Sequence, residues 1–240
     1  MAKNEREMFD VEKIVFDKLE ELDYGVTEAL RTLKTNIQFC GDDIKTILLT
    51  SSIPSEGKST VTLNLARSIA ASGQKVIYVD CDIRKSVIVG RLGAHTENRK
   101  KIFGLSHYLS GQKRVEEVCY STEVDGMDMI FAGPSVPNPT EILGNHYFEE
   151  MLETLRNTYD IVLLDTPPLG SVIDAAVIAP KADGAILVVE QGKVSRRFIK
   201  AVKKQLENSG VKILGAVLNK IEVKKQGYYK KYYGNAYEYR

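Results

Sequence analysis

The sequence predicts an α/β fold, a mostly parallel sheet with helices on both faces, and three observations carry this prediction. Short apolar runs rich in β-branched residues alternate with longer amphipathic segments along the 240 residues. The intervals between the runs are long enough for right-handed crossovers between parallel strands. Polar residues suited to ligand binding follow three of the runs, as expected at the carboxyl edge of such a sheet. The runs begin near residues 46, 76, 127, 161, 185 and 213.

The composition is that of an ordinary globular chain, with 43% hydrophobic and 27% charged residues. We expect one domain over residues 1–223 and a tail over 224–240. Apolar runs stay far below the roughly 20 residues that a membrane-spanning helix needs, and the N-terminus has no secretory core. These features favour a cytoplasmic protein. Three widely spaced cysteines fit reduced thiols better than a disulfide framework or a zinc site: Cys40, Cys81 and Cys119.

The net charge of +1 hides an asymmetry along the chain. Residues 193–240 contain thirteen Lys and Arg against three acidic residues, a net charge of +10, and the preceding residues carry −9. A basic region suits an anionic surface such as a membrane or a nucleic acid. Charge runs more often form solvated faces, so both interpretations stay open.

The segment Ser52–Thr60, SIPSEGKST, lies between the predicted strand Thr46–Thr50 and a helix that opens at Ser59. A strand, a tight loop and a helix N-terminus direct backbone N–H groups at one point, where a lysine adds a positive charge. The pattern matches G-x-x-x-x-G-K-[ST] except that Ser52 replaces the first glycine. A simple turn with a solvated lysine is the alternative. The residues expected to contact nucleotide phosphates are Ser55, Glu56, Gly57, Lys58, Ser59 and Thr60.

Acidic residues follow two further predicted strands. Asp80 and Asp82 end the run that begins at Val76, and Asp165 ends the run Ile161–Leu164. Since parallel strands present their carboxyl ends at one edge, these carboxylates should face the phosphates. Asp165 stands where a magnesium-holding acid is expected, acting directly or through water. The convergence indicates a P-loop NTPase-like fold with a site for nucleotide phosphates and Mg²⁺.

Helical periodicity predicts two N-terminal helices over about residues 9–40. The second has Thr27 as its expected N-cap, and its Glu28, Arg31 and Lys34 project from one side. These three residues suit either intrahelical ion pairs or an intermolecular contact. Further helices are expected over 61–72, 141–157 and 196–208, with a loop and a short helix between 91 and 126. The first helix is predicted from one apolar stripe, formed by Val11, Ile14, Val15, Leu19 and Leu22.

The last thirteen residues, YYKKYYGNAYEYR, hold half of the twelve tyrosines. They have no periodic aliphatic face, so we expect a mobile tail. The tail suits an aromatic contact with a partner, a platform for single-stranded nucleic acid, or a set of phosphate acceptors. Each phosphate would add about −1.5 to −2 charges, which would make the tail an electrostatic switch. The tyrosines are Tyr228, Tyr229, Tyr232, Tyr233, Tyr237 and Tyr239.

With these parts together, the chain resembles the bacterial tyrosine kinases of the cytosolic type that controls capsular or exopolysaccharide export in Gram-positive bacteria. VIYVDCDIR is similar to the Walker A′ signature of that family, IVLLDTPP to its Walker B motif, and the tyrosine cluster to its autophosphorylation region. EALRTLK is similar to the self-association motif E-x-x-R-x-x-R, and PNPTEIL and DAAVIA also fit the family. The resemblance extends from about residue 20 to the C-terminus.

The resemblance implies a role for each residue at the site. Lys58 neutralises the β- and γ-phosphates, Ser59 and Asp82 hold Mg²⁺ with Asp165 behind, and Asp80 orients or deprotonates the incoming tyrosine. The choice of Asp80 over Asp82 as the base follows the family pattern.

Two further residues complete this set, and two depart from the family pattern. Arg84 is expected beside the nucleotide, paired with a nearby acid, and Asn219 is a candidate for binding adenine. Lys34 replaces the last arginine of the association motif, and lysine is a poorer bidentate partner. Ser55 stands where the family often has glycine.

The resemblance also implies partners. A separate membrane-anchored activator would complete the ATP site and recruit the chain to the inner face of the membrane. Self-association through Glu28, Arg31 and Lys34 would form a ring in which one tail enters a neighbouring site. A cognate tyrosine phosphatase is expected, and a nucleic acid is not.

Two other functions fit parts of the sequence. Partitioning and division-site ATPases share the fold, but they carry a second lysine early in the loop, and Ser52–Pro54 contains none. A nucleotide-binding scaffold without kinase turnover is the other alternative.

Overall fold

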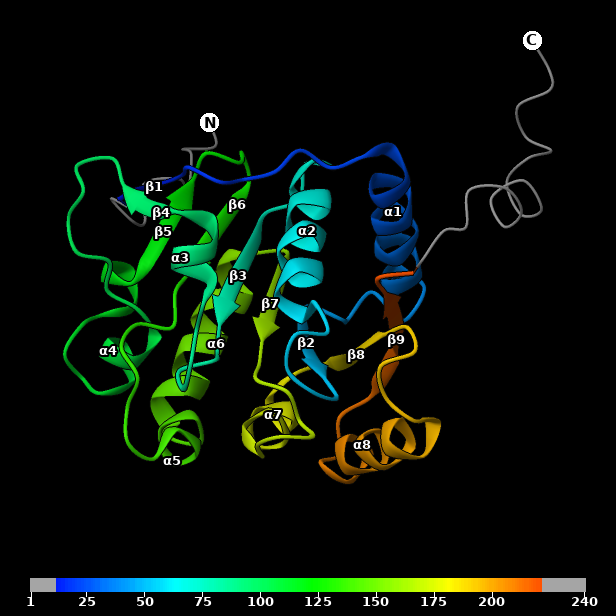
Figure 1. Ribbon diagram of the computed structural model, residues 1–240. Coiled ribbons are helices and arrows are strands. Elements are labelled where there is room, and N and C mark those ends of the chain that lie inside the picture. Colours follow the sequence, from blue (N-terminus) through cyan, green and yellow to red (C-terminus); the bar gives the residue numbers. More distant parts are fainter. Residues whose placement is uncertain (1–11, 222–240) are drawn as a thin grey trace, which may run out of the picture.

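The computed structural model describes residues 12–221, so the tyrosine cluster lies outside the described residues. Within these residues, nine strands form one sheet in the order β4-β1-β5-β6-β3-β7-β2-β8-β9 (Figure 1). The six strands from β6 to β9 pair in parallel, β1 pairs with β5 in parallel, and the pairs β5–β6 and β1–β4 are antiparallel. The strands are β1 Lys13–Phe16, β2 Thr46–Ser51, β3 Val76–Asp80, β4 Ala94–Thr96, β5 Cys119–Thr122, β6 Met127–Ile130, β7 Ile161–Asp165, β8 Gly184–Glu190 and β9 Ile213–Asn219.

Helices cover both faces of this sheet, which confirms the predicted fold class. Buried apolar residues of α1, α2 and α3 form one core with one face, and those of α4 to α8 form a second core with the other face. The helices are α1 Tyr24–Gln38, α2 Lys58–Ala70, α3 Ile88–Leu92, α4 Leu105–Leu109, α5 Pro139–Leu143, α6 His146–Thr158, α7 Asp174–Ile178 and α8 Arg196–Asn208, with 3₁₀ turns at Val115–Glu117 and Ala179–Lys181.

The six predicted strands are present, each beginning within one residue of its expected start. Their central members are buried along their whole length: every residue of β2 and β3 and the first six residues of β8 are buried. Continuous apolar runs are what a sheet covered on both faces requires. The sequence signal was therefore strong for these strands.

The predicted helix built on Val11 to Leu22 is wrong for the described part of that segment. Lys13–Phe16 is a strand in which Ile14 and Phe16 are buried, and it inserts between β4 and β5. The apolar spacing fits a helix. As a strand, however, the segment pairs its backbone N–H and C=O groups with two neighbouring strands, more than a short isolated helical turn could pair. The strands β4 and β5 lie in the region 91–126, where the sequence predicted only a loop and a short helix.

Two helix boundaries also differ from expectation. Asp23, not Thr27, caps α1, because its Oδ1 accepts the Val26 N–H at 2.9 Å. The helix predicted over 141–157 is two helices, since Asn145 caps α6 by accepting the Phe148 N–H at 3.2 Å. Asp and Asn are strong N-caps, and either one resets a helix start.

The three cysteines are free thiols, as predicted, and Cys81 and Cys119 are buried. Within residues 12–221, no helix has the length and apolar character needed to cross a bilayer.

Candidate nucleotide site

Three adjacent strands bring the predicted site residues to one edge of the sheet. In the order β3-β7-β2, Asp80 at the end of β3 pairs in register with Asp165 at the end of β7. The loop after β2 leads directly into α2, which begins at Lys58. The fold therefore brings Lys58, Asp80 and Asp165 together. Lys58 and Asp165 are 107 positions apart in the sequence.

The loop before α2 is held in a shape that requires left-handed backbone conformations. Gly57 has φ +86° and Ser55 has φ +67°. A non-glycine residue in this region costs about 1–2 kcal/mol, so Ser55 holds a strained backbone conformation. A Cβ on Gly57 would lie 2.1 Å from Nδ2 of Asn219, so a side chain at this position would displace the Asn219 amide.

Glu56 holds the loop closed from inside. Its buried carboxylate accepts the N–H groups of Ser52 at 2.6 Å, Ile53 at 2.9 Å and Glu190 at 3.2 Å. The sequence predicted contact between Glu56 and a nucleotide, and the side chain is instead bound to the protein backbone. Any contact with phosphate would come from its own N–H group.

Lys58 and Asp165 form a buried ion pair at the centre of the site, and the Lys58 ammonium also donates to Ser59 Oγ at 3.2 Å. The other Asp165 oxygen, Oδ2, accepts a hydrogen bond of 2.5 Å from the Tyr78 hydroxyl. Tyr78 is fully buried, and burial together with the Asp165 charge raises its pKa well above the ordinary value. Sequence reasoning missed Tyr78, although it is the one polar side chain before the acid in the strand VIYVD.

Asp80 is buried beside this pair and accepts hydrogen bonds from Ser86 Oγ and from the Asp82 N–H at 3.1 Å. Burial and the charge of Asp165 raise the pKa of Asp80 to about 7, although the Ser86 hydrogen bond and Lys58 act against the shift. Asp82 is half-buried and accepts the Lys85 N–H at 3.1 Å. The two carboxyl groups of the D-x-D pattern thus differ in environment.

Arg84 binds Asp174 in a bidentate manner, with Nε and Nη2 at 2.5 and 2.9 Å from its two carboxylate oxygens. The predicted pairing of Arg84 with an acid is confirmed. Thr140 completes the cluster by donating to Asp174 Oδ1 at 2.6 Å and accepting from Arg84 at 3.0 Å. Burial acts to raise the pKa of Asp174, but these hydrogen bonds outweigh it and hold the pKa below the ordinary value.

This cluster shows what sequence reasoning missed. Thr140 lies in PNPTEIL and Asp174 in DAAVIA. Both stretches fit the family pattern, but the sequence alone assigned no role to either. The signal available was a single acid at the start of an apolar helix, which is an ordinary feature.

The comparisons with known proteins agree with this geometry. A family model described as AAA domain matches residues 45–214. Tyrosine-protein kinase CpsD of Streptococcus agalactiae is 39% identical over 210 residues, covering 85% of this chain and 90% of the relative. The chain belongs to the bacterial tyrosine-protein kinases. YwqD of Bacillus subtilis strain 168, also named a tyrosine-protein kinase, is 34% identical and covers 87% of this chain and 86% of its own length.

A solved structure supports the same family. The kinase domain of the Escherichia coli tyrosine kinase ETK superposes with a TM-score of 0.76 at 32% identity, covering 84% of this kinase and 78% of that chain. The fold and the phosphate loop make this kinase a nucleotide-binding protein.

Asn219 closes the kinase's phosphate loop from the last strand. Its Nδ2 donates to the carbonyl of Glu56 at 2.9 Å, and the neighbouring Lys220 donates to the carbonyl of Ser55 at 2.7 Å. Lys220 also reaches Glu190 at 3.0 Å. Two side chains from the end of β9 therefore hold the outer wall of the loop, and Asn219 lies beside Gly57 rather than free in solvent.

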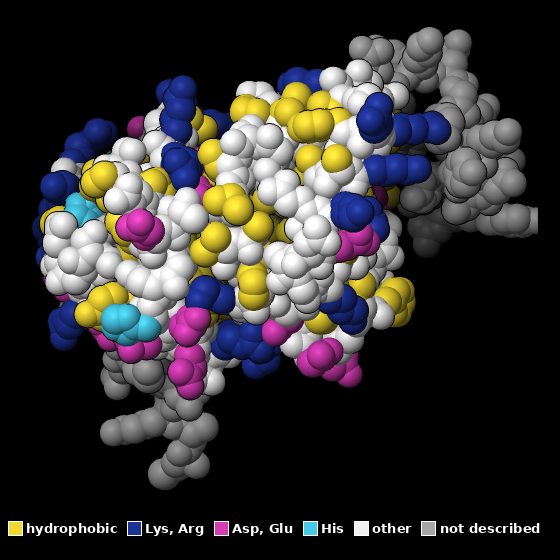
Figure 2. Space-filling view, turned by 90° about the horizontal axis from the view of Figure 1, so that it is seen from below, with side chains coloured by type: hydrophobic (Ala, Val, Ile, Leu, Met, Phe, Trp, Pro, Cys, Tyr) yellow, Lys and Arg dark blue, Asp and Glu magenta, His cyan; other side chains and the backbone are white. Residues whose placement is uncertain are grey.

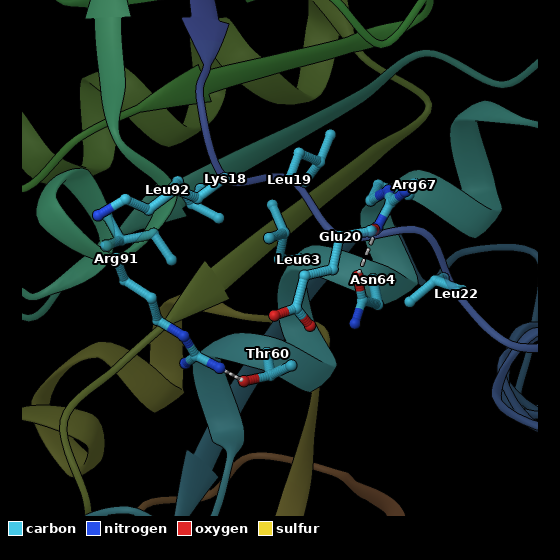
Figure 3. A pocket seen from close by; sticks show the side chains of 11 residues that line it. Lys18, Leu19, Glu20, Leu22, Thr60, Leu63, Asn64, Arg67, Arg91 and Leu92 are labelled. Carbon is cyan, nitrogen blue, oxygen red and sulfur yellow. Dashed lines mark hydrogen bonds between the residues drawn. The ribbon is translucent and has the colours of Figure 1, made fainter.

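The side chain of Thr60 points away from this loop in the kinase, into a cavity of about 480 Å³ beside α2. Figure 3 shows Arg91 reaching Thr60 across this cavity, where Nη2 donates to Oγ1 at 2.5 Å. Asn64 and Arg67 of α2 line the same cavity, and Arg67 Nη1 donates to the Glu20 carbonyl at 3.0 Å. Thr60 would therefore meet a nucleotide through its backbone N–H.

The residues of the kinase's association motif lie on α1. Arg31 Nη1 donates to Glu28 Oε1 at 2.5 Å, and the two side chains remain 65% and 41% exposed. The intrahelical pair that the spacing allows is thus present. Arg31 and Lys34 line a second cavity of about 540 Å³ between α1 and α2.

Proposed function

We propose that this kinase transfers the γ-phosphoryl group of ATP to tyrosines of its own C-terminal cluster, and that it serves capsular or exopolysaccharide biosynthesis. The observation that carries the proposal is the convergence of Lys58, Asp80 and Asp165 beside the phosphate loop. Phosphoryl transfer needs positioning and charge neutralisation more than covalent catalysis, and this edge of the sheet offers both.

The residues present fit ATP and Mg²⁺. The loop and the first turn of α2 offer backbone N–H groups, and Ser59, Asp82 and Asp165 offer the oxygen ligands that Mg²⁺ prefers. Among residues 12–221, no three His, Cys, Asp or Glu side chains form a metal cluster by themselves. This agrees with a magnesium ion held by one or two carboxylates together with nucleotide phosphates. Bound magnesium would neutralise charge on the phosphates.

Lys58 would exchange partners when nucleotide binds. Its ammonium is neutralised by Asp165, and phosphate oxygens would compete for it. Asp165 would then be held by Tyr78 and by Thr62, whose Oγ1 lies 3.4 Å from Asp165 Oδ1.

Asp80 is proposed to take the proton of the incoming tyrosine hydroxyl. A carboxylate with a pKa of about 7 is a better base near neutral pH than an ordinary aspartate. Arg84 would act through its pair with Asp174, which ties the turn after β3 to α7. Asn219, at the end of β9 beside the loop, would bind the adenine of the nucleotide.

Family membership supports a proposal for the partners and the location of this kinase. We propose a membrane-anchored activator that completes the site, a cytoplasmic position at the inner face of the membrane, and a tyrosine phosphatase that reverses the reaction. A ring through Glu28, Arg31 and Lys34 is supported by the exposure of the first two, and its intermolecular contacts would replace the pair within α1. We propose no nucleic-acid partner for this reaction.

Intact-mass analysis tests the proposal. The purified protein is treated with phosphatase and then incubated with ATP, Mg²⁺ and the cytoplasmic segment of the activator. We expect a ladder of phosphate additions that maps to Tyr228–Tyr239 and is absent from Lys58→Met. Equal phosphorylation of the purified Lys58→Met protein would contradict the site assignment.

A truncation separates a kinase from a scaffold. A chain that ends at residue 223 should phosphorylate an added tail peptide if it is a kinase. An unchanged peptide, with ATP binding intact, would favour the scaffold.

A further inference from the structure

The solvent face of α8 carries a concentrated positive charge. Val202 and Leu206 face the core, and Ser195 caps the helix by accepting the Phe198 N–H at 3.2 Å. At about 100° per residue, five exposed cations lie within about 120° of one another on the side away from that core. These residues, called the α8 basic face below, are Arg196, Arg197, Lys200, Lys203 and Lys204.

Most of this charge has no counter-charge. Lys203 pairs with Glu207, and the other four residues form no ion pair within residues 12–221. The first turn of the helix has no acidic residue. The α8 basic face therefore meets solvent as a nearly uncompensated row of cations.

Helix stability does not explain this arrangement. Arg196, Lys200 and Lys204 are spaced i,i+4, and like charges at that spacing destabilise a helix. Arg196 and Arg197 occupy the first turn, where the helix dipole disfavours cations. Because the charges oppose folding of the helix that carries them, an anionic ligand outside the chain is the better explanation.

We propose that the α8 basic face lies on an anionic phospholipid surface. The proposal rests on the proposed function, since an activator in the membrane would hold the kinase beside lipid headgroups. Each Lys or Arg near such a surface raises partitioning by about fivefold. That attraction is weak for one residue and substantial for a row of them. Stable membrane attachment generally combines two separate signals, and the activator would supply the second one.

The composition of the face favours lipid over nucleic acid. Single-strand binding uses aromatic side chains interleaved with cations, and none stands among these five residues, because Phe198 projects from the opposite side toward Gly170. Residues 1–192 carry a net charge of −9, which would repel a long polyanion that wraps around the protein. A flat surface would touch only one side of the molecule.

The position of α8 allows such contact. It joins β8 to β9 at the end of the sheet opposite β4 (Figure 1). Figure 2 views the side on which α8 lies and shows Lys and Arg side chains on the right of that surface. No other element of the described chain packs over the five residues, which are all exposed.

Co-sedimentation with vesicles tests the proposal, without ATP or activator, so that its outcome is independent of kinase activity. The full chain is mixed with vesicles of phosphatidylcholine alone or of phosphatidylcholine with phosphatidylglycerol. The variant carries Arg197→Gln, Lys200→Gln and Lys204→Gln. The matched control removes three cations near β4, at the other end of the sheet, with Arg99→Gln, Lys100→Gln and Lys101→Gln.

We expect binding of the wild type and the control to the anionic vesicles, falling with added salt, and no binding to phosphatidylcholine alone. The α8 variant should bind at least about tenfold more weakly, and its melting temperature should be no lower than that of the wild type, since like-charge repulsion is relieved. Equal loss in both triple variants would overturn the proposal, because it would show that net charge alone matters. Binding of the wild type to random-sequence DNA but not to vesicles, lost in the α8 variant, would also overturn it and assign the face to nucleic acid.

Discussion

The hydroxyl of Tyr78 donates a 2.5 Å hydrogen bond to Asp165, the carboxylate that also pairs with Lys58. Both residues are buried, and they lie on the neighbouring strands β3 and β7. The bond holds the Asp165 side chain from the neighbouring strand β3, while Lys58 contacts it from the start of α2. The nucleotide site is thus supported by a residue that belongs to the core of the sheet.

Replacing Tyr78 with Phe should reduce both stability and phosphorylation. A hydrogen bond to a charged group is worth about 1.5–3 kcal/mol, and Asp165 would lose one of its partners. Urea unfolding and the rate of autophosphorylation measure the two effects. Tyr120→Phe is the matched control, because its hydroxyl accepts the Phe103 N–H at 2.8 Å away from the site. It should lower stability and leave the rate per folded molecule unchanged, and a Tyr78→Phe enzyme with unchanged rate would refute the supporting role.

The rate of autophosphorylation should rise with pH through about 7. Asp80 accepts a proton only when ionised, and burial with the Asp165 charge raises its pKa to about 7. At pH 6 the rate should be about tenfold below its plateau, and Asp80→Asn should be slow at every pH. Initial rates by intact mass between pH 5.5 and 8.5 provide the measurement. A flat profile for the wild type would exclude Asp80 as the base.

The same shift predicts a pH dependence of stability. The folded pKa of Asp80 lies above its unfolded value, so the folded protein binds the proton more tightly and the unfolded chain loses it first. This contribution to stability is complete at low pH and declines as pH rises from about 4 to about 7. Urea unfolding of the wild type should show the decline relative to Asp80→Asn. If the unfolding free energy of the wild type, relative to that of Asp80→Asn, increased over this pH range, the predicted direction would be contradicted.

Breaking the pair of Arg84 and Asp174 should destabilise the kinase by about 2 kcal/mol or more. Asp174 has no exposed side-chain surface, whereas Arg84 is 36% exposed, so removal of Arg84 leaves a buried carboxylate without its main partner. Arg84→Ala should therefore cost more than the double variant with Asp174→Asn, in which no charge is stranded. Additive losses in a double-mutant cycle would show that the pair is not coupled.

Gly57→Ala should weaken nucleotide binding more than Gly73→Ala does. Both residues have similar positive φ, +86° and +85°, so alanine is strained at either position by about 1–2 kcal/mol. Only at Gly57 would the added Cβ collide, at 2.1 Å from Nδ2 of Asn219. At Gly73 the Cβ would meet no atom of residues 12–221 within 4 Å, apart from its own chain neighbours. Isothermal titration with ADP separates the two variants. Equal affinities would mean that the loop adapts to the new side chain.

The six consecutive parallel strands, the phosphate loop and the acids at the strand ends were predictable from the sequence alone. Their signals are local: buried parallel strands read as continuous apolar runs, and Gly57–Lys58–Ser59 stand together in the chain. The strand β1 was not predictable, because residues 11–22 fit a helical period and only pairing with β4 and β5 makes Lys13–Phe16 extended. The three-residue strand β4 carries too little pattern for any local signal.

The amino-acid sequence by itself determined the family, the order of most strands and helices along the chain, and the residue types at the site. Tertiary structure alone decided which of those residues are bound to one another: Glu56 to the loop backbone, Tyr78 to Asp165, and Arg84 to Asp174. The physical reason is distance along the chain. The last two contacts join residues 87 and 90 positions apart, and a side chain's partner at that separation depends on strand register and helix packing, which no local pattern encodes.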